Sequence, residues 1–459
     1  MDTNNININE IKDISYVNSA RIAAVKILSR FERSDSYLDK LIFNELKKNK
    51  LSSVDKALLH ELVNGVIRWK EKLDYVLVGF YHGDYMKLLN IIKNALRVGL
   101  YQIMFLDKIP VHAAINESVE FVKNIQSEKT ANIANGVLRN IARNVENIRF
   151  PDKESDPIYH YSVVFSHPRW MVRRWEERFG KEELEKLLFV NNKRPYVPVR
   201  VNTLQTNVDD VKSYFESNGY DYYVSPYVPS TIILRSPKTD ISNLDLFKEG
   251  LITIQDPSAS MAAKLSNPHT GQFIVDACAA PGGKSFYIAE MTGDECRIIS
   301  LDKYESKLKQ IEDNAKRLKL SSIQPMVGDA ETITFDSKPD LVFCDVPCSG
   351  LGTLSKKPDI KWKRDIDDVY ILSKVQKKII SHAAELLDIG GVLVYSTCTI
   401  EPEENRDVIK WFLKNNPNFE LDPAENYLPE EVCKDGFMET YLHKHFIDGA
   451  FAARLIKRS

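Results

Sequence analysis

From residue 254 onward, short apolar strand patterns alternate with longer amphipathic helix patterns, and this alternation restricts the fold more than any other feature. The strand patterns lie at residues 273–276, 297–301, 340–344 and 391–395, and residues 450–455 could add a last strand. Helix patterns fill residues 285–291, 303–318, 366–387 and 403–414. Strands and helices in this order predict a mostly parallel, doubly wound sheet of the α/β class over residues 254–459.

Residues 16–148 show helical periodicity throughout and predict an all-α bundle, in which Ser53 is a candidate cap for the third helix. Residues 16–150 carry 21 lysines and arginines against 14 aspartates and glutamates, although the net charge of the whole chain is −2. A basic module on a near-neutral chain fits the binding of a polyanion. Solvated helix faces remain the simpler explanation for the charge alone.

The remaining segments are predicted from their composition. The Asn-rich residues 1–15 predict a mobile tail, and the charged, proline-bounded stretch within 149–164 predicts a linker. Residues 165–253 predict a small α+β module, with strands at 197–202 and 231–235 and a helix at 208–218.

Several functional classes are disfavoured by what the sequence lacks. The sequence has no long apolar run and no signal-peptide pattern, so we expect neither membrane insertion nor secretion. Six sparse cysteines without paired metal-ligand spacing predict reduced thiols and no metal site. We therefore expect a cytoplasmic protein, acting as a monomer.

A glycine-containing loop, Asp276-Ala-Cys-Ala-Ala-Pro-Gly-Gly-Lys-Ser285, follows the first strand of this sheet and opens a helix. Gly282 and Gly283 carry no Cβ, so the backbone can approach a ligand closely. A phosphate-binding loop would need a glycine where Cys278 stands, and the dinucleotide fingerprint Gly-x-Gly-x-x-Gly is absent. S-adenosylmethionine remains, because its zwitterionic tail suits an acidic strand end and bare backbone amides.

Acidic residues fall at the carboxyl ends of consecutive strands. Asp276 ends the pattern at 273–276, Asp302 and Asp345 follow the patterns at 297–301 and 340–344, and Asp329 follows the region of a third strand between the last two patterns. Asp302 can accept hydrogen bonds from both ribose hydroxyls of a nucleoside, and Asp329 could contact its adenine end. One such aspartate is usually a helix cap or loop residue. Four of them at the edge where doubly wound sheets bind ligands predict a cofactor site.

Two cysteine motifs follow the fourth and fifth strands, with Cys348 in residues 345–352 and Cys398 in residues 395–405. A thiolate that adds to carbon 6 of cytosine makes carbon 5 nucleophilic enough to take a methyl group from a sulfonium. Loss of the C5 proton and expulsion of the cysteine then restore the ring. Asp345 could hold or protonate the N3 edge of the base. Chemistry alone leaves either cysteine as the nucleophile, and the other four are expected to pack: Cys278, Cys296, Cys344 and Cys433.

These motifs resemble those of the RNA cytosine-5 methyltransferases of the NOL1/NOP2/Sun family. Residues 53–69 resemble the NusB family of RNA-binding domains, residues 200–203 the family's middle module, and residues 448–454 its closing strand. The combination is similar to family members that methylate 16S small-subunit ribosomal RNA. It implies a multidomain protein with a NusB-like bundle, a small α+β module and a class I, Rossmann-like methyltransferase domain.

The resemblance also implies a role for each site residue. It assigns the attack on the base to Cys398, and adduct breakdown with product release to Cys348. It places the S-adenosylmethionine site at Cys278, Ala279, Ala280, Pro281, Gly282, Gly283, Lys284, Asp302, Asp329 and Asp345.

Five cations surround Trp362 in a loop that could contact RNA phosphates and stack a base, or could equally be a solvated loop: Lys356, Lys357, Lys361, Lys363 and Arg364. Family members usually carry arginines before the Pro-Asp-Ile-Lys segment, so the bidentate fork is lost here. Two alternative functions remain, namely methylation of transfer or large-subunit ribosomal RNA and a non-catalytic RNA-binding or antitermination role. The NusB-like head argues against the first, and the intact motifs against the second.

Overall fold

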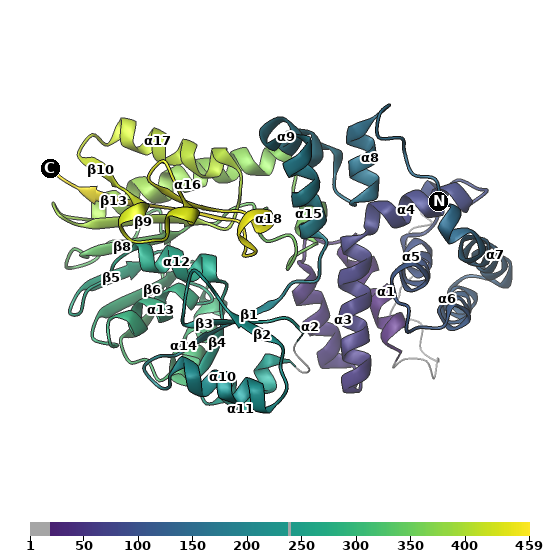
Figure 1. The fold of residues 1–459 in the computed structure, drawn as a ribbon, viewed down its shortest axis with the longest axis horizontal. Coiled ribbons are helices and arrows are strands. Elements are labelled where there is room, and N and C mark those ends of the chain that lie inside the picture. The colour runs from purple at the N-terminus through teal and green to yellow at the C-terminus, as the bar shows by residue number, and fades with distance from the viewer. Residues whose placement is uncertain (1–18, 237–239) are drawn as a thin grey trace. The chain divides into compact units, whose positions relative to one another are not determined.

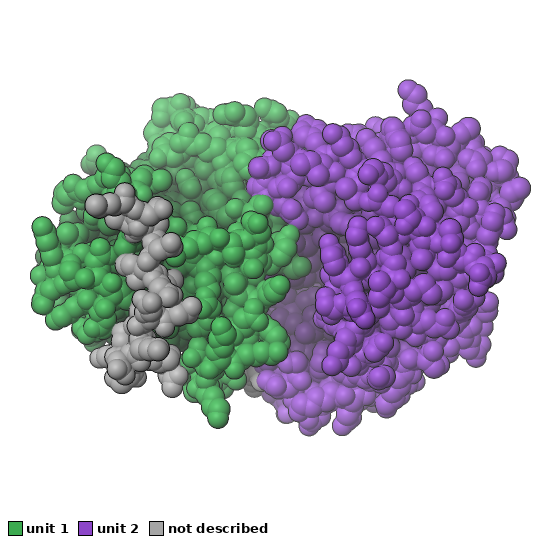
Figure 2. Space-filling view, turned by 180° about the vertical axis from the view of Figure 1, so that it is seen from behind, with its two compact units in different colours: residues 1–192, 357–363 green, residues 193–356, 364–459 purple. Residues whose placement is uncertain are grey.

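The computed structural model describes residues 19–236 and 240–459, so the predicted tail at residues 1–15 lies outside the described residues. The chain divides into two compact units, which Figure 2 shows in different colours. Unit 1 contains the chain up to Asn192 together with Lys357–Lys363, and unit 2 contains Lys193–Lys356 and Arg364–Ser459. In the described residues, we find no helix with the length and apolar character needed to cross a membrane.

Unit 1 is a helical bundle, as predicted. Its helices are α1 (Ala20–Phe31), α2 (Leu38–Lys48), α3 (Ser53–Arg68), α4 (Lys70–Phe80), α5 (Asn90–Phe105), α6 (Val111–Ile125), α7 (Glu128–Asn144), α8 (Pro157–Val164), α9 (Arg169–Asn191) and the short α15 (Ile360–Lys363) (Figure 1). Helix α5 is buried along residues 91–102 and forms the centre of the core. The cap of α3 is Ser52 and not Ser53, because the Ser52 hydroxyl accepts the backbone N–H of Asp55.

Part of the stretch predicted as a linker is helical. Helix α8 begins at Pro157, where the fixed φ of proline suits a first helical position. The Asp156 side chain caps this helix by accepting the backbone N–H of Tyr159. Helix α9, predicted as part of the α+β module, belongs to unit 1. The charged composition of residues 151–157 therefore marks a helix start as well as a connection.

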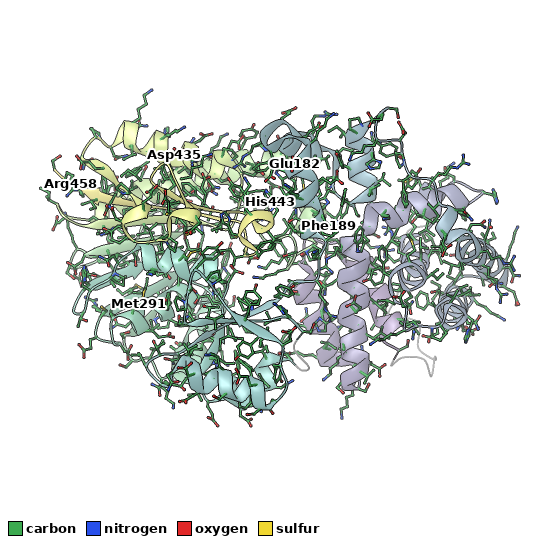
Figure 3. All side chains as sticks on the ribbon, in the orientation of Figure 1. Glu182, Phe189, Met291, Asp435, His443 and Arg458 are labelled. Atoms are coloured by element: carbon green, nitrogen blue, oxygen red, sulfur yellow. The ribbon has the colours of Figure 1, made fainter. Side chains whose placement is uncertain are left out.

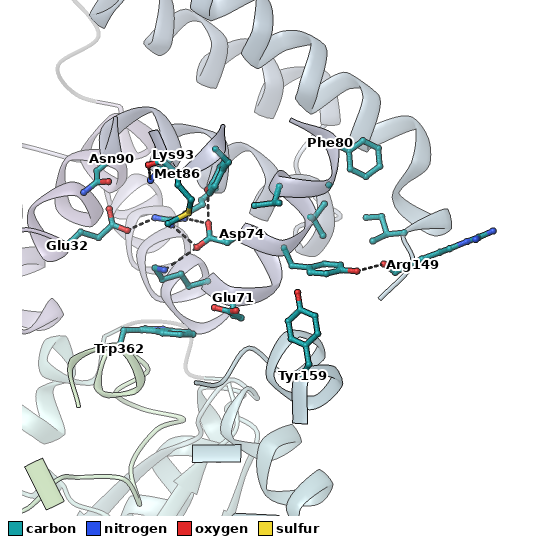
Figure 4. A pocket seen from close by; sticks show the side chains of 18 of the residues that line it. Glu32, Glu71, Asp74, Phe80, Met86, Asn90, Lys93, Arg149, Tyr159 and Trp362 are labelled. Atoms are coloured by element: carbon teal, nitrogen blue, oxygen red, sulfur yellow. Dashed lines mark hydrogen bonds and ion pairs between the residues drawn. The ribbon is translucent and has the colours of Figure 1, made fainter. Parts of the chain in front are cut away.

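A charge cluster around the buried Arg97 forms one wall of a pocket of about 960 Å³ in unit 1 (Figure 4). The Arg97 guanidinium donates to the two carboxylate oxygens of Asp74, at 2.6 and 2.8 Å, and to Glu32 at 2.6 Å. Burial alone would raise the pKa of Asp74, but the charges of Arg97 and Lys70 outweigh it and hold this pKa at about 2. Each charge of the cluster depends on its partners, because an unpaired buried charge is strongly destabilising.

Lys361 is built into the bundle of unit 1, and neither of the two expectations for it, an RNA contact or a solvated loop, agrees with its position. Its side chain is fully buried. The ammonium donates hydrogen bonds to the carbonyl oxygens of Arg68 and Ser166, both at 2.8 Å, and to the Asn192 side chain at 3.0 Å. Arg68 is the last residue of α3, where carbonyls lack helical partners and attract a cation. These carbonyls explain why a lysine is buried here.

The neighbours of Lys361 are also tied to the bundle. The Trp362 indole N–H donates to the Ile67 carbonyl at 2.7 Å, and the Lys363 ammonium donates to the Phe31 carbonyl at 2.8 Å. Trp362 packs against the apolar core of unit 1. Its predicted role as a stacking platform for RNA is therefore not supported by its surroundings. Lys357 is the exposed lysine of this segment.

Replacing Lys361 with methionine keeps the length of the side chain but removes the donors for three buried oxygens. We expect Lys361→Met to lower the free energy of unfolding of unit 1 by about 3 kcal/mol. Urea unfolding followed by tryptophan fluorescence measures this, since four of the five tryptophans lie in unit 1. The control Lys357→Met should change stability by less than about 0.5 kcal/mol. Similar losses in both variants would contradict a specific role for Lys361.

Unit 2 begins with a small antiparallel sheet in the strand order β2-β3-β1-β4. Its elements are β1 (Val197–Val201), α10 (Val208–Ser217), β2 (Tyr222–Val224), β3 (Thr231–Leu234), α11 (Asp245–Lys248) and β4 (Ile252–Ile254). Arg200 on β1 is fully buried and forms an ion pair with Glu290. This buried pair lies away from the carboxyl edge of the large sheet, because Glu290 lies near the end of the helix that follows the glycine-containing loop.

The large sheet of unit 2 has a parallel half in the order β7-β6-β5-β8-β9. These strands are β5 (Phe273–Asp276), β6 (Arg297–Asp302), β7 (Ile323–Val327), β8 (Leu341–Asp345) and β9 (Val392–Thr397). The remaining strands are antiparallel at one edge, namely β10 (Phe419–Asp422), β11 (Cys433–Lys434), β12 (Phe437–Thr440) and β13 (Ala450–Lys457). Strand order reverses at β5, which is the position where doubly wound sheets bind ligands.

Helices cover both faces of this sheet (Figure 1). They are α12 (Pro257–Leu265), α13 (Gly283–Met291) and α14 (Glu305–Leu318) on one face, and α16 (Ile366–Leu386) and α17 (Arg406–Asn415) on the other, while the short α18 (Leu442–His445) lies near β13 in sequence. Figure 3 labels Met291 at the end of α13. Neighbouring strand residues such as Ile274 and Val275 pack into opposite layers, as alternation along a strand requires. The predicted multidomain fold, with a Rossmann-like domain, is confirmed.

Candidate active site at the carboxyl edge of the sheet

The large sheet brings the predicted acidic residues and cysteines to one edge. Asp276, Asp302 and Asp345 are the last residues of β5, β6 and β8, and Asp329 lies two residues beyond β7. The two cysteine motifs leave β8 and β9 at the same edge, because these strands are parallel neighbours. The sequence prediction that these residues share an edge agrees with this arrangement.

The loop of residues 278–284 connects β5 to α13 and has a backbone that a larger residue could not adopt. Gly282 has φ +102°, and a Cβ at this position would collide with the ring of Phe286. Gly283 begins α13, and Pro281 is exposed while Cys278 is half-buried. The loop thus presents bare backbone at the start of a helix, where N–H groups lack helical acceptors.

Asp276 supports this loop from beneath. Its side chain is buried and accepts the Ser285 hydroxyl at 2.6 Å. Ser285 in turn accepts the hydroxyl of Ser300 on β6 at 2.9 Å. This chain of hydrogen bonds fixes the start of α13 to two strands. Asp276 therefore shapes the loop, and it does not face the open edge as the sequence suggested.

Asp302 and Asp329 lie further along the same edge. Asp302 is buried, and its carboxylate accepts the backbone N–H of Tyr304 at 3.0 Å and the Lys307 ammonium at 3.2 Å. Asp329 is more exposed and pairs with Lys303 at 2.8 Å. Both carboxylates keep lone pairs available for further donors, such as hydroxyl or amino groups of a ligand.

Lys284 joins the cofactor loop to the cysteine motifs. Its ammonium donates to one carboxylate oxygen of Asp345 at 2.5 Å, and the Ser396 hydroxyl donates to the other at 2.8 Å. Burial lowers the pKa of Lys284, but the charge of Asp345 and, less strongly, that of a Cys398 thiolate outweigh it and leave this pKa raised. Lys284 therefore stays charged, and a nearby cation favours the thiolate form of a cysteine.

Cys348 and Cys398, the cysteines of the two motifs, lie in contact with each other. Their Sγ atoms are 3.2 Å apart, and the backbone N–H of Cys398 donates to Sγ of Cys348 at 3.3 Å. Cys398 is exposed, whereas Cys348 is half-buried. The hydrogen bond to the Cys398 sulfur, followed by burial, raises the pKa of Cys348 well above its ordinary value. Cys348 therefore favours its protonated form, while the Cys398 side chain is exposed.

Two residues of the second motif were missed by the sequence analysis, which assigned a role only to Cys398. Glu404 is fully buried and bonds to Ser349, next to Cys348. Asn405 bonds to the residues on both sides of Cys398. The available signal was their place at the end of the motif at residues 395–405 that contains Cys398, directly before a helix.

The remaining residues singled out in the sequence have other surroundings. Lys356 pairs with Asp256 at 2.5 Å and Asp448 at 2.8 Å, so it is not the free cation predicted for RNA contact. Cys344 and Cys296 are buried, while Cys278 and Cys433 are half-buried. Within residues 19–236 and 240–459, no group of three or more His, Cys, Asp or Glu side chains is arranged to hold a metal ion.

Asp276 gives a pH dependence that can be measured. Burial, with the charge of Asp345 adding to it, raises the pKa of Asp276 from 3.8 to about 6. A carboxyl with a raised pKa in the folded state stabilises the protein below pH 4, and this stability is lost as the pH rises through about 6. A shift of two units corresponds to about 3 kcal/mol.

We expect Asp276→Asn to remove this dependence, because the amide keeps the size of the side chain and can still accept the Ser285 hydroxyl. Between pH 4 and pH 7.5, the free energy of unfolding of the variant should rise by about 3 kcal/mol relative to that of wild type. Urea unfolding, with hydrogen–deuterium exchange of β5 and α13 as the readout, measures the difference. Asp336→Asn, in an exposed position, is the control. Parallel pH profiles of wild type and Asp276→Asn would refute the assignment.

Three stretches of the chain match known protein families. Residues 18–143 match the NusB family, and residues 167–242 match the ferredoxin-like domain of RsmF/B-like methyltransferases. Residues 263–456 match the family described as 16S rRNA methyltransferase RsmB/F, and this match includes both cysteine motifs. The three matches follow the chain in the order predicted from its sequence.

Individual relatives match most of the chain. It is 34% identical over 447 residues to the probable ribosomal RNA small subunit methyltransferase B of Bacillus subtilis, covering 96% of this chain and 99% of that protein. It is 32% identical over 399 residues to ribosomal RNA small subunit methyltransferase B of Vibrio cholerae, covering 85% and 90%. The crystal structure of the protein PH0851 matches with a TM-score of 0.80 at 25% identity, covering 97% and 99%. The chain therefore belongs to the RsmB/F family of 16S rRNA methyltransferases.

Proposed function

We propose that this protein transfers a methyl group from S-adenosylmethionine to carbon 5 of a cytosine in 16S ribosomal RNA. The pair of Cys348 and Cys398, 3.2 Å apart at the edge of the sheet, carries this proposal. The names of the relatives favour small-subunit ribosomal RNA as the substrate. We further propose that the chain acts in the cytoplasm as a monomer.

The cofactor loop fits S-adenosylmethionine. The bare backbone at Gly282 and Gly283 suits the amino-acid tail, and the strand-end carboxylates of Asp302 and Asp329 suit the hydroxyl and amino groups of the nucleoside. The full set of proposed contacts comprises residues 278–284 with Asp302, Asp329 and Asp345. When bound, this cofactor supplies an electrophilic methyl group on a sulfonium sulfur.

The protein's own side chains make the cytosine reactive. The target base leaves its stack to enter the site. The Cys398 thiolate, stabilised by Lys284, forms a bond to carbon 6. Asp345 holds or protonates the N3 edge, which neutralises the negative charge that develops as the adduct forms. Carbon 5 is then an enamine carbon, which forms a bond to the methyl group while the bond between that methyl group and the sulfonium sulfur breaks. Cys348 acts after methyl transfer and assists breakdown of the adduct, when the C5 proton and the Cys398 sulfur leave.

The NusB-like bundle binds RNA away from the target base in this proposal. Its lysines and arginines exceed its acidic residues, so it contributes affinity that falls as salt rises. Cations in contact with phosphates carry no sequence information by themselves. The choice of the target cytosine therefore depends on how the base fits beside Cys398.

Cys398→Ala should abolish methyl transfer, because no thiolate remains to activate carbon 5. The variant should still bind S-adenosylmethionine with an affinity near that of wild type, measurable by calorimetry. Bisulfite mapping of total RNA from cells that lack the gene, complemented with wild type or the variant, identifies the target. Wild type should restore one methylated cytosine in 16S ribosomal RNA, and the variant should not. Restoration by the variant would disprove the mechanism, and a cytosine in another RNA would correct the substrate.

Cys348→Ala should trap the covalent RNA–protein adduct, because Cys398 still attacks but release is slow. The adduct should survive denaturing gel electrophoresis as a band that carries both protein and RNA. The double variant Cys348→Ala, Cys398→Ala is the matched control and should show no such band. An adduct that requires Cys348 and forms without Cys398 would reverse the two roles.

A further inference from the structure

A buried carboxylate, Glu404, holds the loop that carries Cys348. One oxygen of Glu404 accepts the backbone N–H of Ser349 at 2.8 Å, and the other accepts the Ser349 hydroxyl. The Gln376 side-chain amide donates to Glu404 at 2.9 Å and to the Pro347 carbonyl at 2.9 Å. The residues immediately before and after Cys348 are therefore both fixed by one hydrogen-bonded group around Glu404.

Glu404 is itself fixed in place by the neighbouring strand. Its backbone carbonyl accepts the hydroxyl of Tyr395 on β9 at 2.5 Å, and Tyr395 is fully buried. The Ser349 hydroxyl also lies 2.8 Å from the hydroxyl of Thr399, next to Cys398. These contacts connect the Cys348 loop to the end of β9 and to the Cys398 loop. A rigid connection of this kind sets the distance between the two sulfurs.

Asn405, the next residue, holds the other cysteine. Its side-chain oxygen accepts the Thr397 hydroxyl at 2.6 Å, and its side-chain nitrogen donates to the Thr399 carbonyl at 3.0 Å. Asn405 thus contacts both neighbours of Cys398 and, among its side-chain contacts in the described residues, none of the Cys348 loop. Two consecutive residues therefore each hold a different thiol, which allows their effects to be separated by experiment.

We propose that Glu404 is a positioning residue for Cys348 and thereby controls the breakdown of the covalent adduct. The inference rests on the proposed function, in which Cys348 serves release and Cys398 serves attack. Without Glu404, the Ser349 N–H and hydroxyl lose their buried acceptor, so the Cys348 loop is free to move. A displacement of about 1 Å at a reacting group is enough to slow a step by roughly 100-fold.

The charge of Glu404 adds an effect on proton transfer. Glu404 is among the groups that raise the pKa of Cys348, after the bond to Cys398 and burial. Glu404→Gln keeps the shape of the side chain but removes this charge. The pH at which adduct breakdown changes rate should therefore fall in Glu404→Gln, whereas a loss of packing alone would not move the profile.

The test is a single-turnover reaction of the full-length protein with transcribed 16S ribosomal RNA and labelled S-adenosylmethionine. Glu404→Ala should form the adduct at close to the wild-type rate and release methylated RNA roughly 10- to 100-fold more slowly. Adduct should accumulate on denaturing gels. Asn405→Ala should show the opposite pattern, with slower adduct formation and no accumulation.

Two further variants keep the test decisive. Ser349→Ala removes the hydroxyl contact to Glu404 but keeps the backbone N–H, so it should slow release by a smaller factor even if Glu404→Ala fails to fold. Glu290→Gln is the control for a general loss of structure, because it breaks a buried ion pair away from both cysteine loops. It should lower the rates of adduct formation and of product release together. Release at the wild-type rate in folded Glu404→Ala and Ser349→Ala would overturn the inference. Failure of Cys348→Ala to trap adduct in the same assay would instead overturn the proposed function.

Discussion

The pairing of β8 with β9 is the constraint on which the candidate site depends. The two strands are parallel, and their register places Asp345 opposite Ser396. Because both strands end at the same edge of the sheet, the loops that carry Cys348 and Cys398 leave it side by side. A slip of one residue would turn Asp345 or Ser396 to the other face of the sheet and would break their hydrogen bond. The buried apolar residues of both strands on the two faces oppose such a slip.

The antiparallel edge supports this register from the other side. β13 pairs with β9. Gly449, the residue before β13, donates its N–H to the Gly352 carbonyl at 2.9 Å. Gly352 donates its own N–H to the Cys398 carbonyl at 3.1 Å, and a Cβ on Gly352 would collide with the Gly449 carbonyl. The loop after Cys348 therefore rests directly on backbone from two other segments. Through this close contact, the start of the C-terminal strand supports the loop that carries Cys348 as well as the sheet.

The sequence predicted what periodicity and local motifs determine, and missed what tertiary contacts determine. β5 was predicted with the observed bounds, because a short apolar run before a glycine loop has few other interpretations. The strands β10, β11 and β12 were not predicted, since they are two to four residues long and depend on pairing near β13. The sequence located Lys284 in the cofactor loop, but not its bond to Asp345, which is 61 residues away. Glu404 was missed for the same reason.

Lys361 shows how misleading charge alone can be. Its sequence context, a lysine-rich loop around a tryptophan, fits RNA contact and a solvated loop equally. In the structure, the Lys361 ammonium donates hydrogen bonds to the Arg68 carbonyl at the end of α3 and to the Ser166 carbonyl. The bundle is therefore built from two separate parts of the chain, and a fragment ending at residue 192 would lack a buried donor and part of its apolar core. The segment that completes the bundle follows the Cys348 motif in sequence. The bundle and Cys348 are consequently linked by a short stretch of the same chain.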